Sequence, residues 1–400
     1  MYSPDHPMPR WLPVLLGFLT AVGPVSIDMY LPAFPILATD FHSLAAPQLT
    51  LAAFFAGLGV GQMMQGPLSD RLGRRGPLMV GLVIFTIASL GCALAPDATS
   101  LCILRAIAAF GGSAAVVIPR AMVRDMADGA AAARLFAKLM LVMGVAPVLA
   151  PILGSLILQV GSWRLIFLVA ALFGLVALVL VWRFLPDTLE PSRRLQLGFG
   201  GVFRRYGMVI TERGFLTHGL VGTFGLGALF AYVAGAPVVF ISRYGFSPLE
   251  FALMFGVYAM FYIGSAQINA RAVGRYGYAP MISFAVVALG LGSLTLLAAG
   301  FANSASPLPV MAGLLLCEIS LGFMLPSATV GALTSHAAQA GSASALMGTL
   351  QFAAGAVTGT VVGLFADGTA RPMAVTMLAC AACAGLAAWL RPRQTKPIRE

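Results

Sequence analysis

The stretch LVIFTIASLGCALA, residues 82–95, has no charged side chain and no regular alternation of polar and apolar residues. A strand of a membrane β-barrel alternates at about every second position. A membrane helix instead needs about 20 residues that are mostly apolar. Hydrocarbon cannot hydrogen-bond a backbone, so helices and closed barrels are the structures that cross a bilayer. This stretch therefore predicts a membrane-spanning helix.

The composition extends that prediction to the whole chain. Of its 400 residues, 59% are hydrophobic and 10% are charged, whereas soluble domains have about 25% charged residues. So few charges cannot cover a water-exposed surface, which excludes a soluble protein. The formal net charge of +10 does not indicate nucleic-acid binding, because the arginines cluster in short connectors, as in membrane proteins that keep positive loops inside.

Twelve segments fit a spanning helix, and we expect an all-α membrane protein of two pseudo-symmetric six-helix bundles. The bundles are predicted at 1–185 and 215–400, joined by a linker at 186–214. The expected spans are 11–33, 47–66, 77–95, 99–122, 134–158, 163–185, 215–240, 248–270, 279–301, 307–333, 341–365 and 371–391.

The distribution of basic residues predicts the orientation of these spans. Clusters such as Arg71/Arg74/Arg75 and Arg204/Arg205 fall in alternate connectors, and the opposite connectors hold little beyond Arg164, Arg243 and Arg371. Because basic loops stay on the cytoplasmic side, both termini and the 186–214 linker are expected in the cytoplasm.

A weak internal sequence repeat supports a division of the chain into two halves. DRLGRRGPL follows the second span and RAVGRYGYAP follows the eighth. The pairs Gly73-Arg74 and Gly274-Arg275 are expected to hold equivalent places. Parallel repeats of this kind build one large class of secondary transporters, with the substrate site between the halves.

The first connector, GPLSDRLGRRGPL at residues 66–78, is more specific than a positive loop. Its glycines are expected to make tight turns, and Asp70 is expected to face a helix N-terminus, where the dipole favours negative charge. The arginines are expected to pair with Asp125, in RAMVRDMA beyond the fourth span. We name this predicted set of residues the clasp; its members are Gly66, Asp70, Arg71, Gly73, Arg74, Arg75 and Asp125.

This connector resembles the signature loop of the major facilitator superfamily, matching at Gly66, Leu68, Asp70, Arg71, Gly73, Arg74 and Arg75. APVLAPILG in the fifth span resembles the proline/glycine motif of the family's drug/proton antiporters. Its residues Pro147, Pro151 and Gly154 are in place, and Ser155 stands where many members have a second glycine. A generic packing kink would explain the same prolines.

Further stretches are similar to the Bcr/CflA branch, which is associated with bicyclomycin resistance and chloramphenicol export. They are DMYLPAFP, GSWRLIFLV, LPDTLEPSRR, YGFSPLEFALMFG and GSASALMGTLQF. The resemblance implies the major facilitator fold and a monomeric proton-coupled multidrug exporter in the bacterial cytoplasmic membrane. Such a protein uses the proton gradient and no cofactor, and it takes small amphipathic compounds. The branch's named substrates do not transfer with the resemblance.

Asp28 is the first charge inside the chain's first apolar segment. It lies about 18 residues beyond Arg10, or about 27 Å along a helix, and the family's span-one acid falls at this position. An ionised carboxylate is costly there, so we expect Asp28 to exchange a proton. Pro32 and Pro35 are expected to break or kink the helix end. The alternative is an interfacial residue wetted from outside.

Arg105, in LCILRAIAAFGG, lies where the family's span-four motif has its arginine. Intramembrane charges usually face an interior cavity, so Arg105 is expected on the transport path, where its charge would steady the ionised form of Asp28. The alternative is snorkelling to the interface. The family's glutamine three residues further on is replaced by Ala108, so its hydrogen bond is missing.

Glu318 lies near the middle of the tenth span, where a carboxylate pairs, stays protonated or contacts a cation. We expect it to take part in proton coupling, and a structural glutamate is the alternative. Polar and aromatic side chains are expected to line an apolar cavity, although membrane aromatics often simply pack. They are Tyr30, Phe34, Phe230, Tyr232, Tyr258, Tyr262 and Gln351.

Other functions are less well supported. An exporter of an endogenous metabolite, such as an amino acid or siderophore, fits the same features, whereas the fifth-span motif disfavours uptake. A membrane enzyme would need paired metal ligands or a nucleophile with its base, and no such constellation or metal site is predicted. Cys380 and Cys383 lie in an apolar segment without a nearby His or carboxylate, so they indicate helix packing.

Overall fold

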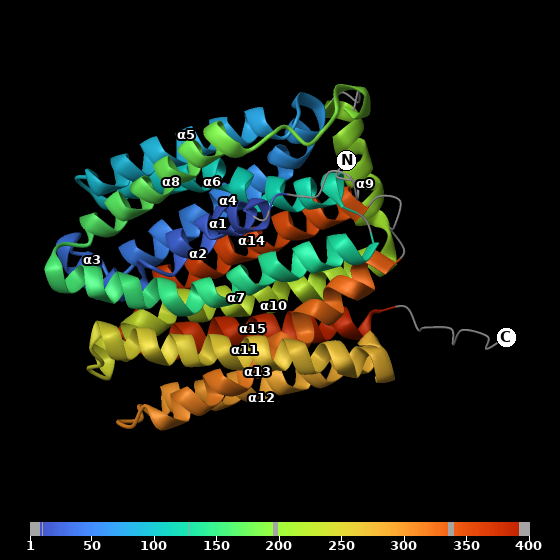
Figure 1. Ribbon diagram of the computed structural model, residues 1–400. Helices are drawn as coiled ribbons and strands as arrows, with labels where there is room; N and C mark the ends of the chain where they lie inside the picture. Colours follow the sequence, from blue (N-terminus) through green and yellow to red (C-terminus); the bar gives the residue numbers. More distant parts are fainter. Residues whose placement is uncertain (1–8, 10, 128, 195–198, 335–339, 392–400) are drawn as a thin grey trace.

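The computed structural model describes residues 9, 11–127, 129–194, 199–334 and 340–391, and the regular structure within them is helical (Figure 1). The first apolar segment is divided into α1, α2, a 3₁₀ turn η1 and α3. The elements up to the linker are α1 Leu12–Thr20, α2 Val22–Ile27, η1 Leu31–Ala33, α3 Phe34–Asp40, α4 Ala46–Leu72, α5 Arg75–Ala93, α6 Ala98–Met126, α7 Gly129–Val160 and α8 Arg164–Phe184.

The linker contains a 3₁₀ turn and a helix, and six long helices follow it. They are η2 Pro191–Arg193, α9 Phe199–Thr211, α10 Arg213–Pro237 with the π-helical turn η3 Val238–Arg243, α11 Pro248–Tyr276, α12 Tyr278–Phe301, α13 Leu308–Leu333, α14 Ala340–Leu364 and α15 Arg371–Trp389. The predicted all-helical membrane fold is confirmed.

Eleven helices among the described residues are long and apolar enough to cross a membrane. The predicted span at 47–66 is not among them. It forms α4, whose 27 residues are long enough to span but include the glutamines Gln48, Gln62 and Gln65, all buried. Their side chains lower the apolar character of α4, and their burial shows that the glutamines face other helices, whereas Val60 and Met64 of α4 are exposed.

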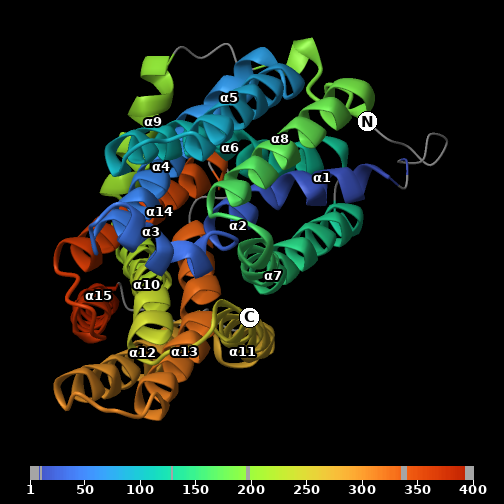
Figure 2. The same ribbon diagram turned by 90° about the vertical axis from the view of Figure 1, so that its left-hand side faces the viewer.

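The helices run side by side in one bundle, and the two halves meet along two helix pairs. α5 and α8 lie on one outer side of the bundle, and α12 and α13 lie on the opposite side (Figures 1 and 2). Between them α4 packs along α14, and α7 packs along α11. These two pairs are the surfaces across which the halves would have to move.

Matching glycines hold one helix crossing together in each half. A Cβ on Gly81 of α5 would lie 2.6 Å from the carbonyl oxygen of Gly111 in α6, and a Cβ on Gly292 of α12 would lie 2.8 Å from that of Gly313 in α13. Small residues let membrane helices approach closely and gain van der Waals contact. The third and fourth spans of each half therefore pack by the same device.

The internal repeat aligns differently in the structure from the alignment predicted from the sequence. Gly73 ends α4 with φ 94°, and the residue with the matching conformation is Gly277, which ends α11 with φ 81°. The predicted equivalence of Gly274 is wrong, because α11 continues through that residue to Tyr276. Only glycine adopts this left-handed backbone readily, which explains a glycine at both helix ends.

The linker helix α9 was not predicted. Tyr206 and Val209 are buried in a small apolar cluster with residues of α14 such as Ala343 and Leu346. The Tyr206 hydroxyl also donates to the carbonyl oxygen of Met63 in α4, at 3.2 Å. α9 therefore contacts elements of both halves, at the end of the bundle where α4 ends and α5 begins. We call this end the clasp end.

Candidate functional site

Asp28 lies at a break in the first span. α2 ends at Ile27, and three turn residues separate it from η1, which contains Pro32. Proline has no N–H to continue the helical hydrogen bonds, so the predicted break is present. Asp28 as a whole residue is 7% exposed, and among the described residues its side chain has no hydrogen-bond or ion-pair partner. An acid in this position is free to exchange a proton or to receive a ligand.

The proline/glycine motif of α7 packs against this break. A Cβ on Gly154 would collide with the carbonyl of Met29, the neighbour of Asp28. Glycine is therefore required at this position for α7 to approach the broken backbone. Pro147 and Pro151 lie inside the same helix, and Ser155 turns its hydroxyl back to the carbonyl of Ile152.

Arg105 is buried in the first half, with 2% of its surface exposed, and it does not snorkel. It donates from Nη1 to the carbonyl oxygen of Ser26 at 2.8 Å. Its guanidinium carbon lies 4.1 Å from the ring centre of Phe54, 4.7 Å from that of Tyr30 and 5.6 Å from that of Phe167. A desolvated cation over aromatic faces gains about 2 kcal/mol.

Arg105 was expected to stabilise the ionised form of Asp28, but the two side chains make no contact that would do so. The described residues contain no hydrogen bond or ion pair between the two side chains, and Arg105 instead binds the backbone two residues before Asp28. Ser26 and Asp28 lie on either side of the last residue of α2. Arg105 is therefore placed to hold the broken segment rather than to neutralise its acid.

Glu318 lies on α13 in the second half. Its side chain is 2% exposed, and its Oε1 has no hydrogen-bond partner. The hydroxyls of Tyr232, Tyr258 and Tyr262 all lie within electrostatic range of it, and Tyr232 is also within range of Asp28. Each half of the described structure therefore holds one buried acid without a hydrogen-bond or ion-pair partner, Asp28 in the first and Glu318 in the second.

The predicted cavity residues separate into two groups. Tyr30 and Phe34 are packed in the core of the first half, and the Tyr30 hydroxyl contacts Thr50 and the carbonyl of Pro47. Phe230 of α10 stacks on Phe55 of α4 with 3.9 Å between ring centres. The remaining residues lie on the second half: Tyr232 stacks on Phe255, Tyr258 donates to Met311, Tyr262 is half-buried, and Gln351 lies beside Gly222.

Arg74 is the centre of the clasp. Its Nε donates to Oδ2 of Asp125 at 2.7 Å and its Nη2 to Oδ1 at 3.2 Å, a bidentate pair. Its Nη1 donates to Asp70 and, at 3.0 Å, to the hydroxyl of Ser69. Burial acts to lower the pKa of Arg74, but the bonds to Asp125 and Asp70 outweigh it and raise the pKa. Arg74 therefore keeps its positive charge at any physiological pH.

Two predicted details of the clasp are wrong. Gly66 lies inside α4 instead of in a turn, because α4 continues to Leu72. Asp70 lies in the last turn of that helix, and the carboxylate at the start of α5 is Asp187, whose Oδ1 accepts from the backbone N–H of Arg74 at 2.9 Å. Asp187 also explains Gly73, since a Cβ there would collide with its carboxylate.

The two outer arginines of the clasp are placed differently. Arg71 is exposed at the end of α4, and Arg75 donates to the carbonyl of Trp182 in α8. Arg74 is thus the clasp arginine that joins α4, α5 and α6. Asp187 could have been suspected from LPDTLEPSRR, which carries an acid before a basic pair.

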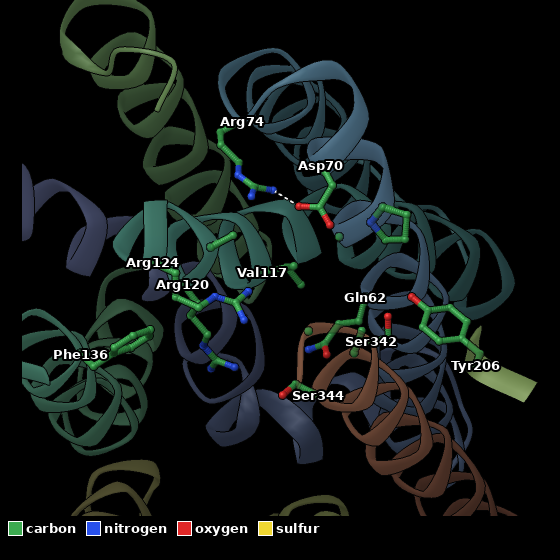
Figure 3. Close-up of a pocket in the computed structure, with 15 residues that line it drawn as sticks. Gln62, Asp70, Arg74, Val117, Arg120, Arg124, Phe136, Tyr206, Ser342 and Ser344 are labelled. Carbon is green, nitrogen blue, oxygen red and sulfur yellow. Dashed lines mark hydrogen bonds and ion pairs between the residues drawn. The ribbon is translucent and has the colours of Figure 1, made fainter. Parts of the chain in front are cut away.

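A pocket of about 290 Å³ opens at the clasp end beside this ion pair (Figure 3). Its lining comes from α4, α6, α7, α9 and α14, so both halves contribute. Arg120 and Arg124 point into it from α6, and Gln62, Tyr206 and Ser342 lie across the hollow. None of the seven predicted cavity residues lines it. Arg120 was not predicted, although its spacing of four residues from Arg124 puts both on one helix face.

The comparison with known proteins identifies the family. The sequence profile described as Major Facilitator Superfamily matches residues 16–360. The chain belongs to the major facilitator superfamily. As a member of this family it is a multi-pass membrane transporter and not an enzyme, and the predicted resemblance is confirmed.

Relatives in this superfamily carry resistance and transport names. The chain is 35% identical over 380 residues to the uncharacterised MFS-type transporter YdgK of Bacillus subtilis, covering 94% of each chain. It is 29% identical to a bicyclomycin resistance protein homologue of Haemophilus influenzae, covering 93% of this chain and 94% of the relative. It is also 29% identical to a chloramphenicol resistance protein of Pseudomonas aeruginosa, covering 92% and 87%.

Solved structures support the fold. A bacterial homologue of the lysosomal transporter Spinster, solved in an inward-facing and unoccupied conformation, superposes with a TM-score of 0.71 at 16% identity. The match covers 96% of this chain and 98% of that one. At this identity the likeness concerns the major facilitator fold alone.

Proposed function

We propose that this chain is a proton-coupled exporter of small amphipathic, drug-like compounds, a drug:H⁺ antiporter. The observation that carries the proposal is the unpaired, buried Asp28 at a helix break against which the glycine of the antiporter motif packs. The named resistance proteins among its relatives support drug-like substrates. The proton gradient supplies the driving force and no cofactor is involved.

In this mechanism Asp28 carries the coupled proton. An ionised Asp28 is unfavourable inside the bundle. The acid therefore takes up a proton in the outward-open state. It releases this proton in the inward-open state, when substrate enters from the cytoplasm. Entry of one proton down a potential of 100 mV releases about 2.3 kcal/mol. That amount sustains an outward gradient of about fiftyfold for a neutral substrate, since about 1.4 kcal/mol corresponds to a factor of ten.

Alternating access would occur across the α4–α14 and α7–α11 contacts. We assign 1–185 and 215–400 as the two moving bundles, with 186–214 as the linker. The clasp holds α4, α5 and α6 together, so that the first bundle moves as one body. Glu318 and the tyrosines around it form the second half's contribution to proton and substrate handling, in a cavity that includes Phe230 and Gln351.

We also propose that the protein is a monomer in the bacterial cytoplasmic membrane, with both termini and the clasp end in the cytoplasm. The exposed arginines support this orientation, since Arg71, Arg204 and Arg275 all belong to connectors or helix ends on the clasp side. Basic side chains favour the cytoplasmic side of a membrane.

Transport by purified protein in vesicles tests the function. With the clasp end outside the vesicles, an acidic interior should drive accumulation of a fluorescent amphipathic compound, and a proton ionophore should collapse it. An empty vesicle and a vesicle without a pH gradient are the controls. Accumulation that ignores the ionophore would refute proton coupling, whereas no accumulation of any compound from a broad set would refute drug export.

A further inference from the structure

The clasp-end pocket contains two cationic side chains that the proposed transport mechanism does not use. Arg120 and Arg124 stand one helical turn apart on α6 and extend into the hollow (Figure 3). The nearby acids Asp70 and Asp125 are both bonded to Arg74. Within the described part of the chain, neither Arg120 nor Arg124 has an ion pair.

Arg120 has an unmet hydrogen-bonding requirement. It is half-buried, and its Nε is shielded from solvent without a hydrogen-bond partner in the described residues. A buried donor on a charged group costs free energy when it is left without an acceptor. An anion in the pocket would balance the charge of this guanidinium and accept hydrogen bonds from its terminal nitrogens.

The opposite wall adds neutral donors. The hydroxyls of Ser342 and Ser344 come from the first turns of α14, and the Gln62 amide comes from α4. The hydroxyl of Tyr206 donates to the carbonyl of Met63, and burial and the charge of Asp70 raise its pKa to about 12, so it adds no negative charge to this wall. Two guanidinium groups, two serine hydroxyls and an amide together offer more donors than the roughly four acceptor sites of one carboxylate.

We propose that this pocket binds the phosphate group of a small molecule or of a lipid headgroup, held by Arg120 and Arg124 on one side and by Ser342 and Ser344 on the other. The planar arginine fork matches phosphate oxygens with paired hydrogen bonds. The volume of about 290 Å³ lies near the lower end of small-ligand pockets, about 300 Å³, so it suits a phosphate on a small polar body.

Binding here has a consequence for transport. The ligand contacts α6 of the first half and α14 of the second, so it favours the arrangement of the halves in which these walls lie at their present spacing. A ligand that binds one conformation better shifts the population toward it. Phosphate binding thus stabilises the arrangement of the two halves that the structure describes.

Thermal unfolding of delipidated protein in maltoside detergent tests the site, because this detergent carries no phosphate. One titration uses glycerol 3-phosphate, a second uses phosphatidylglycerol, and potassium chloride at equal ionic strength is the salt control. We expect saturable stabilisation by at least one phosphate compound and none by chloride. Stabilisation by glycerol 3-phosphate identifies a soluble ligand, and stabilisation by phosphatidylglycerol alone identifies a lipid headgroup.

Arg120→Gln should weaken the apparent affinity by about tenfold or more, since it removes a charge-assisted pair. Arg275→Gln, an exposed arginine at the end of α11, is the matched control and should leave the affinity unchanged. If Arg120→Gln does not fold, Arg124→Gln is measured with the same expectation. Equal stabilisation of Arg120→Gln or Arg124→Gln and wild type, or none by either phosphate compound, would overturn the site. The readout is binding, so failure of drug export would not affect it.

Discussion

At the scale of single residues, Arg105 shows how a charge is kept inside a membrane protein. Its guanidinium donates to a backbone carbonyl of α2 and lies against three aromatic rings. This arrangement uses the planar shape of arginine, which lysine lacks. Nη2 and Nε are shielded from solvent and have no partner in the described structure, so part of the donor capacity of Arg105 is not satisfied.

We predict that Arg105→Ala abolishes export although the protein reaches the membrane. The change removes the group that fixes the segment before Asp28. Arg105→Lys should retain only a minor part of the rate, because it keeps the charge without the planar contacts. Drug accumulation in intact cells, normalised to the protein in isolated membranes, measures both. Near-normal export by Arg105→Ala would show that the charge merely fills a core position.

The sequence predicted the identity of the buried polar residues better than their pairing. Asp28, Arg105 and Glu318 were expected inside the spans because their positions within apolar runs are visible. Arg105 binds the Ser26 carbonyl and not Asp28 because of the way α6 is rotated against α2. This rotation cannot be predicted from the identity of any single residue. Tyr30 and Phe34 were expected at a cavity, but the packing of α3, α4 and α8 encloses them.

At the scale of elements, the clasp joins the ends of α4, α5 and α6 through one arginine. The side chains of Arg74 and Asp125 are 7% and 10% exposed, whereas that of Asp70 is 36% exposed. Breaking one partner of a buried pair costs about 3–5 kcal/mol. We expect the free-energy cost of breaking the Arg74–Asp125 pair to lie below that range, because water still reaches the edge of the pair. The more exposed Asp70 contact should contribute less to stability than the Asp125 contact does.

We predict that Arg74→Ala slows export by about tenfold or more, while the affinity for substrate changes less than about twofold. A loss of about 1.4 kcal/mol at the clasp gives that factor, and no hydrogen bond or ion pair of Arg74 in the described structure reaches Asp28 or Glu318. Asp70→Asn should act in the same direction with a smaller effect. Initial export rates and equilibrium binding to purified protein separate the two quantities.

Arg71→Ala is the matched control, since Arg71 has the same charge in the same connector but is exposed. It should transport at close to the wild-type rate. A large loss of equilibrium binding in Arg74→Ala would contradict a purely conformational role for the clasp.

The helices themselves were predicted within a few residues at most ends, because apolar length and flanking arginines mark them. The first span runs past its expected end, through α3 to Asp40, since a helix resumes at Phe34 with Pro35 in its first turn. α9 was missed because its 13 residues lie in a basic linker with no apolar run. Its burial depends on contacts with α4 and α14 that are distant in sequence.

At the scale of the whole molecule, the orientation is a prediction of its own. In a cysteine-free background, Ser192→Cys should resist a membrane-impermeant maleimide in intact cells and react after the cells are opened. Ser192 is exposed in the linker, so access to the side chain does not limit the reaction. Ser306→Cys, exposed between α12 and α13, is the matched control and should react from outside. The reverse pattern would invert the topology.

The central claim is that one acid, Asp28, couples proton movement to export. Asp28→Asn keeps the shape and hydrogen-bonding capacity of the protonated acid but cannot titrate. We therefore expect the variant to bind substrate and to permit downhill movement, because alternating access does not itself require a titrating group. Uphill export should be lost.

Proton release from purified protein on addition of substrate is the most direct measurement. The protein is held in weakly buffered detergent solution with a pH-sensitive dye, and a saturating transported compound is added. Wild type should release protons over a limited pH range, and Asp28→Asn should release none while binding the same compound. Normal proton release together with uphill export by Asp28→Asn would contradict the account and would direct the same measurement to Glu318.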